Sequence, residues 1–127
     1  MRQFVRQSCI ILILILSLAG SVARAMSKPI VELASWYGRA HHGKKMANGR
    51  LFDRFRLTAA HRTIKLGTLV RVCLLKTGKC VDVLVTDRGP FKGRRGLDVS
   101  EAAAEAIGLK PYGVGRVTIE ELHDQSR

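Results

Sequence analysis

The sequence predicts a mainly β domain, a small closed barrel with one short α-helix. Four short segments, at residues 31–37, 69–75, 81–86 and 117–122, are either mostly apolar or alternate apolar with polar residues. Both patterns are typical of strands. Helix signals gather in a single segment near residue 101. Short strands around one small helix favour a closed barrel, because closure removes the exposed strand edges that promote aggregation.

The helix is predicted from its two ends. Ser100 is a good N-cap residue, Glu101 places a negative charge in the first turn, and an alanine-rich run follows to Ile107. Gly108 then supplies the residue that most often ends a helix. The expected helix is therefore 101–107.

Residues 1–25 are predicted to be a signal peptide for export. Arg2 and Arg6 precede an apolar block at 9–16, and Ala23-Arg24-Ala25 offers small residues for a signal peptidase. The apolar block is shorter than the roughly 20 residues that span a bilayer, which disfavours the alternative of an uncleaved anchor. Cleavage after Ala25 leaves one domain, 26–127. Because Cys9 is not placed for lipidation, we expect no stable membrane anchor after cleavage.

The composition is strongly basic, with a formal net charge of +12. Such a surface attracts anionic partners, although a solvated basic loop is the plainer alternative. The export signal argues against nucleic acid as that partner. The basic residues near the two candidate motifs described below are Lys44, Lys45, Arg50, Arg54, Arg56, Lys92, Arg94 and Arg95.

Cys73 and Cys80 flank a predicted strand–turn–strand segment with a glycine at the turn. In an oxidising compartment they are expected either to form a disulfide or to remain two buried thiols, depending on the register of the hairpin. The adjacent His41 and His42 lack the spacing of a chelating pair. We therefore expect neither a metal site nor a cofactor.

Asp87 ends the apolar run that begins at Val81, and Gly89-Pro90 then turns the chain. Strict alternation places Asp87 on the same face as Val83 and Val85. A carboxyl partly desolvated there holds its proton more readily, which suits a general acid. The alternative is a structural role, in which the carboxylate caps the turn by accepting backbone N–H bonds.

Two further features accompany Asp87. His61 closes the segment Thr58-Ala59-Ala60-His61 and could orient a carboxylate or share a proton with it, although a lone histidine is more often a structural hydrogen-bonding residue. Trp36-Tyr37 offers flat rings of the kind that stack on sugars, although most such pairs serve packing.

Five blocks of sequence together resemble a known family. They are ASWYG (34–38), MANGRLFD (46–53), LTAAHRTIKLGTLVRV (57–72), VTDRGPF (85–91) and GLDVSEAAAEAIG (96–108). In order and spacing they resemble the rare lipoprotein A-like (RlpA-like) lytic transglycosylases, over roughly residues 33–122. The resemblance implies a six-stranded double-psi β-barrel with one short α-helix.

The resemblance also implies a function. It implies endolytic cleavage of the β-1,4 bond between N-acetylmuramic acid and N-acetylglucosamine in peptidoglycan glycan strands, leaving 1,6-anhydro ends, in the periplasm or as a secreted protein. Asp87 matches the catalytic acid/base and His61 the histidine of the same groove. We also expect a monomer. The residues expected to contact the glycan are Trp36, Tyr37, Asn48, Thr58 and Arg88.

A single dominant acid suits lytic cleavage better than hydrolysis, which usually needs two carboxylates. Asp53 could in principle approach from the loop as a second acid, and Asp98 is expected to be structural. Arg50 stands where the family often has an acid, which predicts weakened or altered activity. The alternative function is therefore a non-catalytic, expansin-like module that binds peptidoglycan or another polysaccharide.

Overall fold

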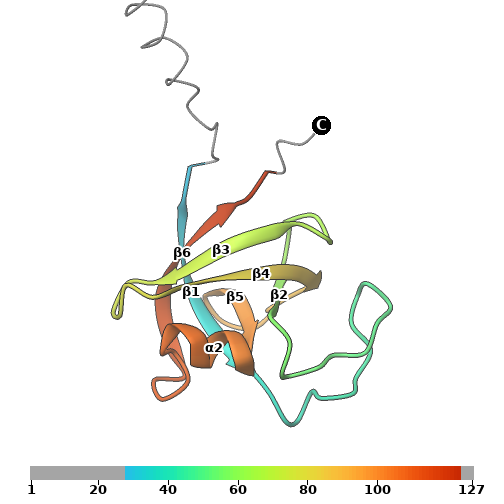
Figure 1. Cartoon of the computed structure of the whole chain (residues 1–127). Coiled ribbons are helices and arrows are strands. Elements are labelled where there is room, and N and C mark those ends of the chain that lie inside the picture. Colours follow the sequence, from blue (N-terminus) through green and yellow to red (C-terminus); the bar gives the residue numbers. More distant parts are fainter. Residues whose placement is uncertain (1–27, 124–127) are drawn as a thin grey trace, which may run out of the picture.

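The computed structural model describes residues 28–123, so the predicted signal peptide at 1–25 lies outside the described residues. No helix within residues 28–123 is both long enough and apolar enough to cross a membrane. The elements, drawn in Figure 1, are β1 (Ile30–Tyr37), β2 (Thr58–His61), β3 (Leu69–Leu74), β4 (Cys80–Asp87), β5 (Arg95–Ser100), α2 (Glu101–Ile107) and β6 (Val114–Glu121).

The strands form a closed barrel in the order β1-β5-β2-β4-β3-β6. The pairs β1–β5 and β2–β4 are parallel, and the other pairs are antiparallel. Every strand therefore has two hydrogen-bonded neighbours, so none presents an open edge. The helix α2 lies against the barrel beside β5 (Figure 1). The prediction of a mainly β closed barrel with one short helix is confirmed for the described residues.

The core is built from residues that alternate along the strands. On β3, for example, Val70, Val72 and Leu74 are buried while Leu69 and Arg71 are exposed. Alternation has this effect because successive side chains in a strand point to opposite faces. The helix closes one side of the core with its buried Ala103, Ala104 and Ile107.

The local patterns did not indicate β2 or β5 as strands. β2 contains two alanines and a histidine, which have little intrinsic preference for strands. All four of its residues are buried, and it lies between β5 and β4. Its conformation is therefore set by pairing on both sides, which a single sequence does not display.

The predicted helix boundaries are confirmed. The Ser100 hydroxyl accepts a hydrogen bond from the backbone N–H of Ala103, and Gly108 ends the helix in the left-handed conformation with φ of 76°. The same hydroxyl donates to the carbonyl of Arg56 at 2.6 Å. One serine thus caps the helix and fastens the loop that leads into β2.

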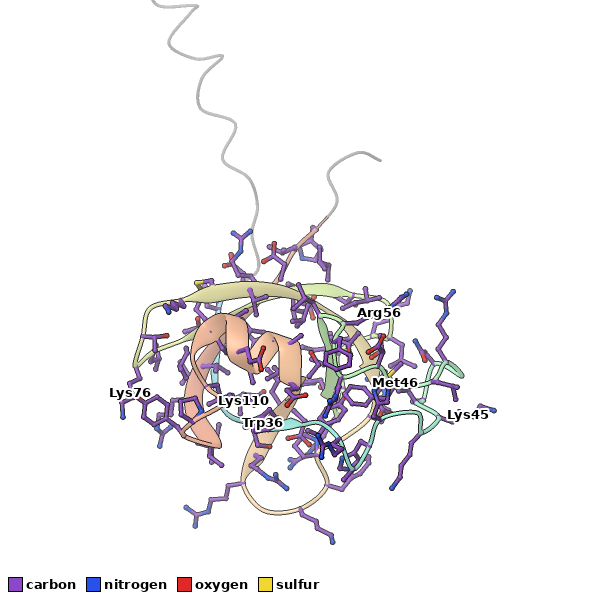
Figure 2. All side chains as sticks on the ribbon, turned by 60° about the horizontal axis from the view of Figure 1, so that its bottom comes forward. Trp36, Lys45, Met46, Arg56, Lys76 and Lys110 are labelled. Atoms are coloured by element: carbon purple, nitrogen blue, oxygen red, sulfur yellow. A yellow bond between two sulfur atoms is a disulfide. The ribbon has the colours of Figure 1, made fainter. Side chains whose placement is uncertain are left out.

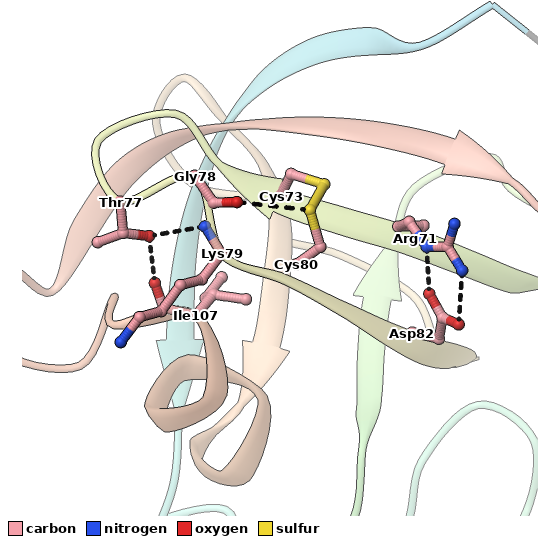
Figure 3. The surroundings of a disulfide bond; sticks show 8 residues. All are labelled: Arg71, Cys73, Thr77, Gly78, Lys79, Cys80, Asp82 and Ile107. Atoms are coloured by element: carbon pink, nitrogen blue, oxygen red, sulfur yellow. Dashed lines mark hydrogen bonds and ion pairs between the residues drawn. A yellow bond between two sulfur atoms is a disulfide. The ribbon is translucent and has the colours of Figure 1, made fainter.

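Cys73 and Cys80 lie directly opposite each other on β3 and β4, and their sulfur atoms are bonded at 2.08 Å (Figure 3). The turn between them is also fixed from the helix side. The Thr77 hydroxyl donates to the carbonyl of Ile107 at 2.7 Å. The hairpin β3–β4 is therefore closed covalently at the end that packs on α2.

We expect the double variant Cys73→Ser/Cys80→Ser to unfold at a lower denaturant concentration. A bond that closes a loop of this length restricts the unfolded chain, and its removal should lower the free energy of unfolding by about 2.5 kcal/mol. Guanidinium titration of the two proteins measures the difference. Equal midpoints for the oxidised wild type and the double variant would show that the bond contributes nothing to stability.

Candidate functional site

Four neighbouring strands carry a row of residues on the outer face of the barrel. Ser35 on β1 is in register with Asp98 on β5, Asp98 with Ala60 on β2, and Ala60 with Asp87 on β4. Residues in register share a face, and strands lie nearly 5 Å apart, so the Cα atoms of the two aspartates are separated by about 10 Å. On this face, the small side chain of Ala60 therefore lies between the two carboxylates.

Asp87 does not share the face of Val85, which corrects the orientation expected from strict alternation. Ala59 pairs with Val85, but its neighbour Ala60 pairs with Asp87, so Thr86 is an extra residue in β4. Such a bulge changes which face the following residue occupies. Val85 is fully buried in the core, whereas Asp87 is only partly buried. The carboxyl is therefore delivered to the outer face.

The Asp87 carboxyl is held by two backbone amides. Its Oδ1 accepts hydrogen bonds from the N–H of Ala47 at 2.9 Å and from the N–H of Arg88 at 2.8 Å. This is the capping role that was the alternative to catalysis in the sequence. No hydrogen bond or ion pair within residues 28–123 is assigned to Oδ2, so one oxygen is fixed while the other has no assigned protein partner.

The segment that contacts Asp87 through the N–H of Ala47 is a small hairpin at residues 43–52. It is closed by a bridge between Lys45 and Leu51, and Gly49 turns its tip with a φ of 87° that favours glycine. Asn48 fastens it in two ways: its side chain accepts from the N–H of Arg50 at 2.9 Å, and its own N–H donates to the carbonyl of Thr86 at 3.1 Å. Asn48 is thus a residue that shapes this wall.

Beside the hairpin is an open cavity of about 440 Å³. Its floor comes from outer-face residues of β2 and β4, including Thr58, Leu84 and Thr86, and its wall includes Asn48 and Phe52. Arg50, Asp53 and Arg56 also line it. Figure 2 shows Lys45, Met46 and Arg56 on this side of the barrel. The cavity therefore combines apolar surface with polar and guanidinium groups, and Asp87 directly follows its lining residue Thr86.

Tyr37 lies on the same outer face as Ser35 and packs against Phe52, with ring centroids 4.4 Å apart. Its hydroxyl is buried and has no hydrogen-bond partner among the described residues. Burial, together with the nearby carboxylates of Asp87 and Asp98, raises the pKa of this hydroxyl far above its usual range. Tyr37 therefore stays neutral beside the two acids.

Trp36 occupies the opposite face of β1. It pairs with the core residue Val99, packs against the core, and has the Lys110 Nζ 5.7 Å from its ring centroid (Figure 2). Of the aromatic pair, the structure places Tyr37 beside Asp87 and Trp36 in the packing between core and helix.

Asp98 joins the site although the sequence suggested only a structural role. The Ser35 hydroxyl donates to its Oδ1, and the Arg95 guanidinium lies 3.9 Å from the same oxygen. The signal that could have found it is alternation, since Asp98 separates the buried Leu97 and Val99 and so must face outward. Asp53, the other acid suggested from the loop, does line the cavity, and its Oδ1 accepts from the N–H of Phe55 at 2.9 Å.

His61 lies on the inner face at the end of β2, with 5% of its surface exposed. Its Nε2 is 3.2 Å from Oε1 of Glu32, a partner that the sequence gave no reason to choose. Arg88 turns its guanidinium toward the His61 backbone, donating to that carbonyl at 3.1 Å. The structure therefore brings Asp87, Tyr37, Asn48 and Thr58 to one face and does not bring the His61 ring there.

Within residues 28–123 no group of three or more histidine, cysteine or acidic side chains is arranged to hold a metal ion. The chemistry that this site can perform with its own groups is proton transfer by a carboxyl at the edge of an open cavity.

Fold and site together define a six-stranded barrel of the double-psi type with an aspartate on its outer face. The family model described as lytic transglycolase matches residues 31–119, and the chain belongs to this RlpA-like family.

Two relatives and two solved structures illustrate the comparison. The chain is 50% identical over 88 residues to the probable endolytic peptidoglycan transglycosylase RlpA of Synechocystis, covering 69% of this chain and 27% of the relative. It is 48% identical over 96 residues to the endolytic peptidoglycan transglycosylase RlpA of Rickettsia bellii, covering 73% and 42%. The chain thus spans less than half the length of these relatives.

Among solved structures, the Streptomyces papain inhibitor matches with a TM-score of 0.62 and 20% identity, covering 80% of this chain and all of that one. The apo expansin of Clavibacter michiganensis matches with a TM-score of 0.61 and 21% identity, covering 79% and 53%. At these identities the likeness concerns the fold alone.

Proposed function

We propose that this protein is an endolytic peptidoglycan lytic transglycosylase. It cleaves the β-1,4 bond between N-acetylmuramic acid and N-acetylglucosamine and leaves 1,6-anhydro-N-acetylmuramic acid ends. Family membership and the names of the two relatives support the reaction. The observation that carries it is Asp87, whose Oδ1 is fixed by two backbone amides while its Oδ2 has no hydrogen-bond or ion-pair partner among residues 28–123. Asp87 directly follows Thr86, which lines the outer-face cavity.

The proposed reaction uses one carboxyl twice. Protonated Asp87 gives its proton to the glycosidic oxygen as the bond from that oxygen to C1 of the muramic acid breaks. The C6 hydroxyl of the same sugar then attacks C1, and the Asp87 carboxylate accepts the hydroxyl proton. The new C1–O6 bond closes the anhydro ring, no water is consumed, and Asp87 ends protonated as it began.

The other two acids of this region, Asp53 and Asp98, are both held by protein contacts, which favours lytic cleavage over hydrolysis. A hydrolase needs another acid to activate water or attack the sugar. Asp98 is engaged by the Ser35 hydroxyl, which donates to its Oδ1, and lies near the Arg95 guanidinium. We propose that Asp98 orients this face and that the substrate supplies the nucleophile itself.

The cavity suits a glycan that carries acetamido and carboxylate groups. Leu84 and Phe52 offer apolar surface to a sugar face or methyl group, and Asn48 and Thr58 shape the wall and floor. Arg50 and Arg56 would attract carboxylates of muramic acid or its peptides. Arg50 would then tune substrate binding as much as rate. We place this activity outside the cytoplasm, at the cell wall.

The test is incubation of the purified chain with peptidoglycan sacculi and with glycan strands lacking peptides, followed by separation and mass spectrometry of the released sugars. Release of muropeptides or sugars with anhydro ends is the expected result. Products with reducing ends would mean hydrolysis. Bound glycan without any product would instead support the non-catalytic binding module, the second function compatible with the two amide bonds that make Asp87 a turn cap.

A further inference from the structure

The His61 ring has both nitrogens occupied by the protein. Nδ1 accepts hydrogen bonds from the backbone N–H groups of Thr63 and Ile64, each at 3.1 Å. Nε2 lies 3.2 Å from Oε1 of Glu32. Only 5% of the residue is exposed. A nitrogen that accepts from amides carries no proton, so the proton of the neutral ring belongs on Nε2, where it is donated to Glu32.

This arrangement leaves no ring nitrogen for a sugar. A group that exchanges a proton with substrate must reach it directly or through one water. His61 instead shares the inner face with Leu97, its register partner, whereas Asp87 faces outward beside Ala60. The cavity that His61 does line, with Glu32 and Thr63, shares no lining residue with the outer-face cavity beside Asp87.

The His61 backbone, in contrast, is connected to Asp87. The ring fixes the turn at 61–64 by accepting its two amides. The carbonyls of His61 and Ile64 in that turn both accept from NH1 of Arg88, at 3.1 and 2.5 Å. The N–H of Arg88 then donates to Oδ1 of Asp87 at 2.8 Å. A continuous set of contacts therefore leads from the buried ring to the candidate acid.

Glu32 completes this set from β1. Its Oε1 meets the His61 ring, while its Oε2 is buried without a hydrogen-bond partner among the described residues. The side chain passes directly over Gly96, where a Cβ would collide with the carboxylate. Space for Glu32 is thus provided by the missing side chain, and a partly buried carboxylate held there favours the Nε2–H tautomer of His61.

We propose that His61 is a positioning residue for Asp87, acting through Arg88, and does not itself carry protons in the reaction. Its imidazole acts as a fixed acceptor that shapes the 61–64 turn, and the turn anchors the guanidinium that holds the end of β4. Glu32 orients the ring. The effect on cleavage rests on the proposed function, whereas the geometry does not.

The decisive comparison is His61→Asn against His61→Ala. The Asn Oδ1 occupies the place of Nδ1 and accepts from N–H groups two and three residues on, but an amide cannot transfer protons. We expect the alanine variant to lose cleavage by about 100-fold, the scale of a misplaced catalytic group. The asparagine variant should recover most of that loss and keep the wild-type dependence of rate on pH.

Arg88→Met should lower cleavage as His61→Ala does, because it removes the anchor of the same turn. Arg71→Met is the matched control, since Arg71 pairs with Asp82 on the exposed side of β3–β4 and should leave cleavage unchanged. An asparagine variant as inactive as the alanine variant, with its fold intact by amide spectra, would overturn the proposal. So would a pH–rate profile that loses one limb when His61 becomes asparagine.

Nuclear magnetic resonance separates this inference from the proposed function. Nitrogen-15 spectra of the wild type should show Nδ1 without a proton and Nε2 with one, and the Nδ1–H tautomer would overturn the assignment. The amide signals of Ala47 and Arg88, which report the Asp87 bonds, should move in His61→Ala and stay in His61→Asn. If the wild type cleaves no glycan, the proposed function fails while these spectra still test the positioning.

Discussion

Asp87→Asn is expected to lose cleavage by about 1,000-fold while keeping the fold. Proton transfer by a positioned side chain contributes rate factors of this order, and an amide cannot supply it. The substitution is mild structurally, because the Asn oxygen can still accept from the N–H groups of Ala47 and Arg88. Initial rates of soluble product release from sacculi, measured for both proteins at equal concentration, give the ratio.

Asp82→Asn is the matched control on the same strand. Asp82 is paired with Arg71 by two hydrogen bonds at 2.9 and 3.2 Å on an exposed part of β4, away from the cavity. Such surface pairs contribute little, so neither rate nor stability should change appreciably. Undiminished cleavage by the Asp87 variant would remove Asp87 from the mechanism and leave it only the role of turn cap.

Gly96→Ala is expected to destabilise the barrel by about 1 to 2 kcal/mol, because the Glu32 side chain must shift away from the added methyl group. The backbone of Gly96 is not left-handed, so the requirement for glycine comes from space alone. An added Cβ would meet the Glu32 carboxylate, forcing it to move and leaving the His61 ring without its partner. Overpacking and a broken, partly buried hydrogen bond act in the same direction. Urea titration followed by circular dichroism measures the loss.

A double variant identifies the cause. Adding Glu32→Ala removes the carboxylate and leaves only the Glu32 Cβ, 3.1 Å from the new methyl group, so the two substitutions should cost less together than their separate sum. Strict additivity would mean that the methyl group collides with something other than Glu32. A Gly96→Ala variant as stable as the wild type would show that the Glu32 side chain can accommodate a methyl group at residue 96 without cost.

Much of the fold was predictable because alternation is a local property. The strands β1, β3, β4 and β6 and the helix α2 were expected close to where they occur, since each displays its own periodicity or caps. β2 and β5 were not, because their pairing on both sides is a property of the closed barrel. Their residues are short or mixed runs that become strands only between other strands.

The residue types of the site were predictable from the sequence, but the face of the barrel on which each residue lies was not. Asp87 and His61 stand out in the sequence, yet the extra residue Thr86 in β4 decides that Asp87 points outward. No local pattern announces that bulge, because it arises from the register between β2 and β4. In the same way, Glu32 as the partner of His61 and Asp98 as the neighbour of Tyr37 depend on contacts between strands far apart in the chain.

The most direct test of the central claim is the mass of the newly formed glycan ends when cleavage proceeds in water enriched with oxygen-18. Intramolecular attack by the C6 hydroxyl uses no solvent oxygen. The account therefore predicts ends one water lighter than a reducing sugar and free of label, formed by the wild type and not by Asp87→Asn. Reducing ends that carry oxygen-18 would contradict it, because water would then be the nucleophile.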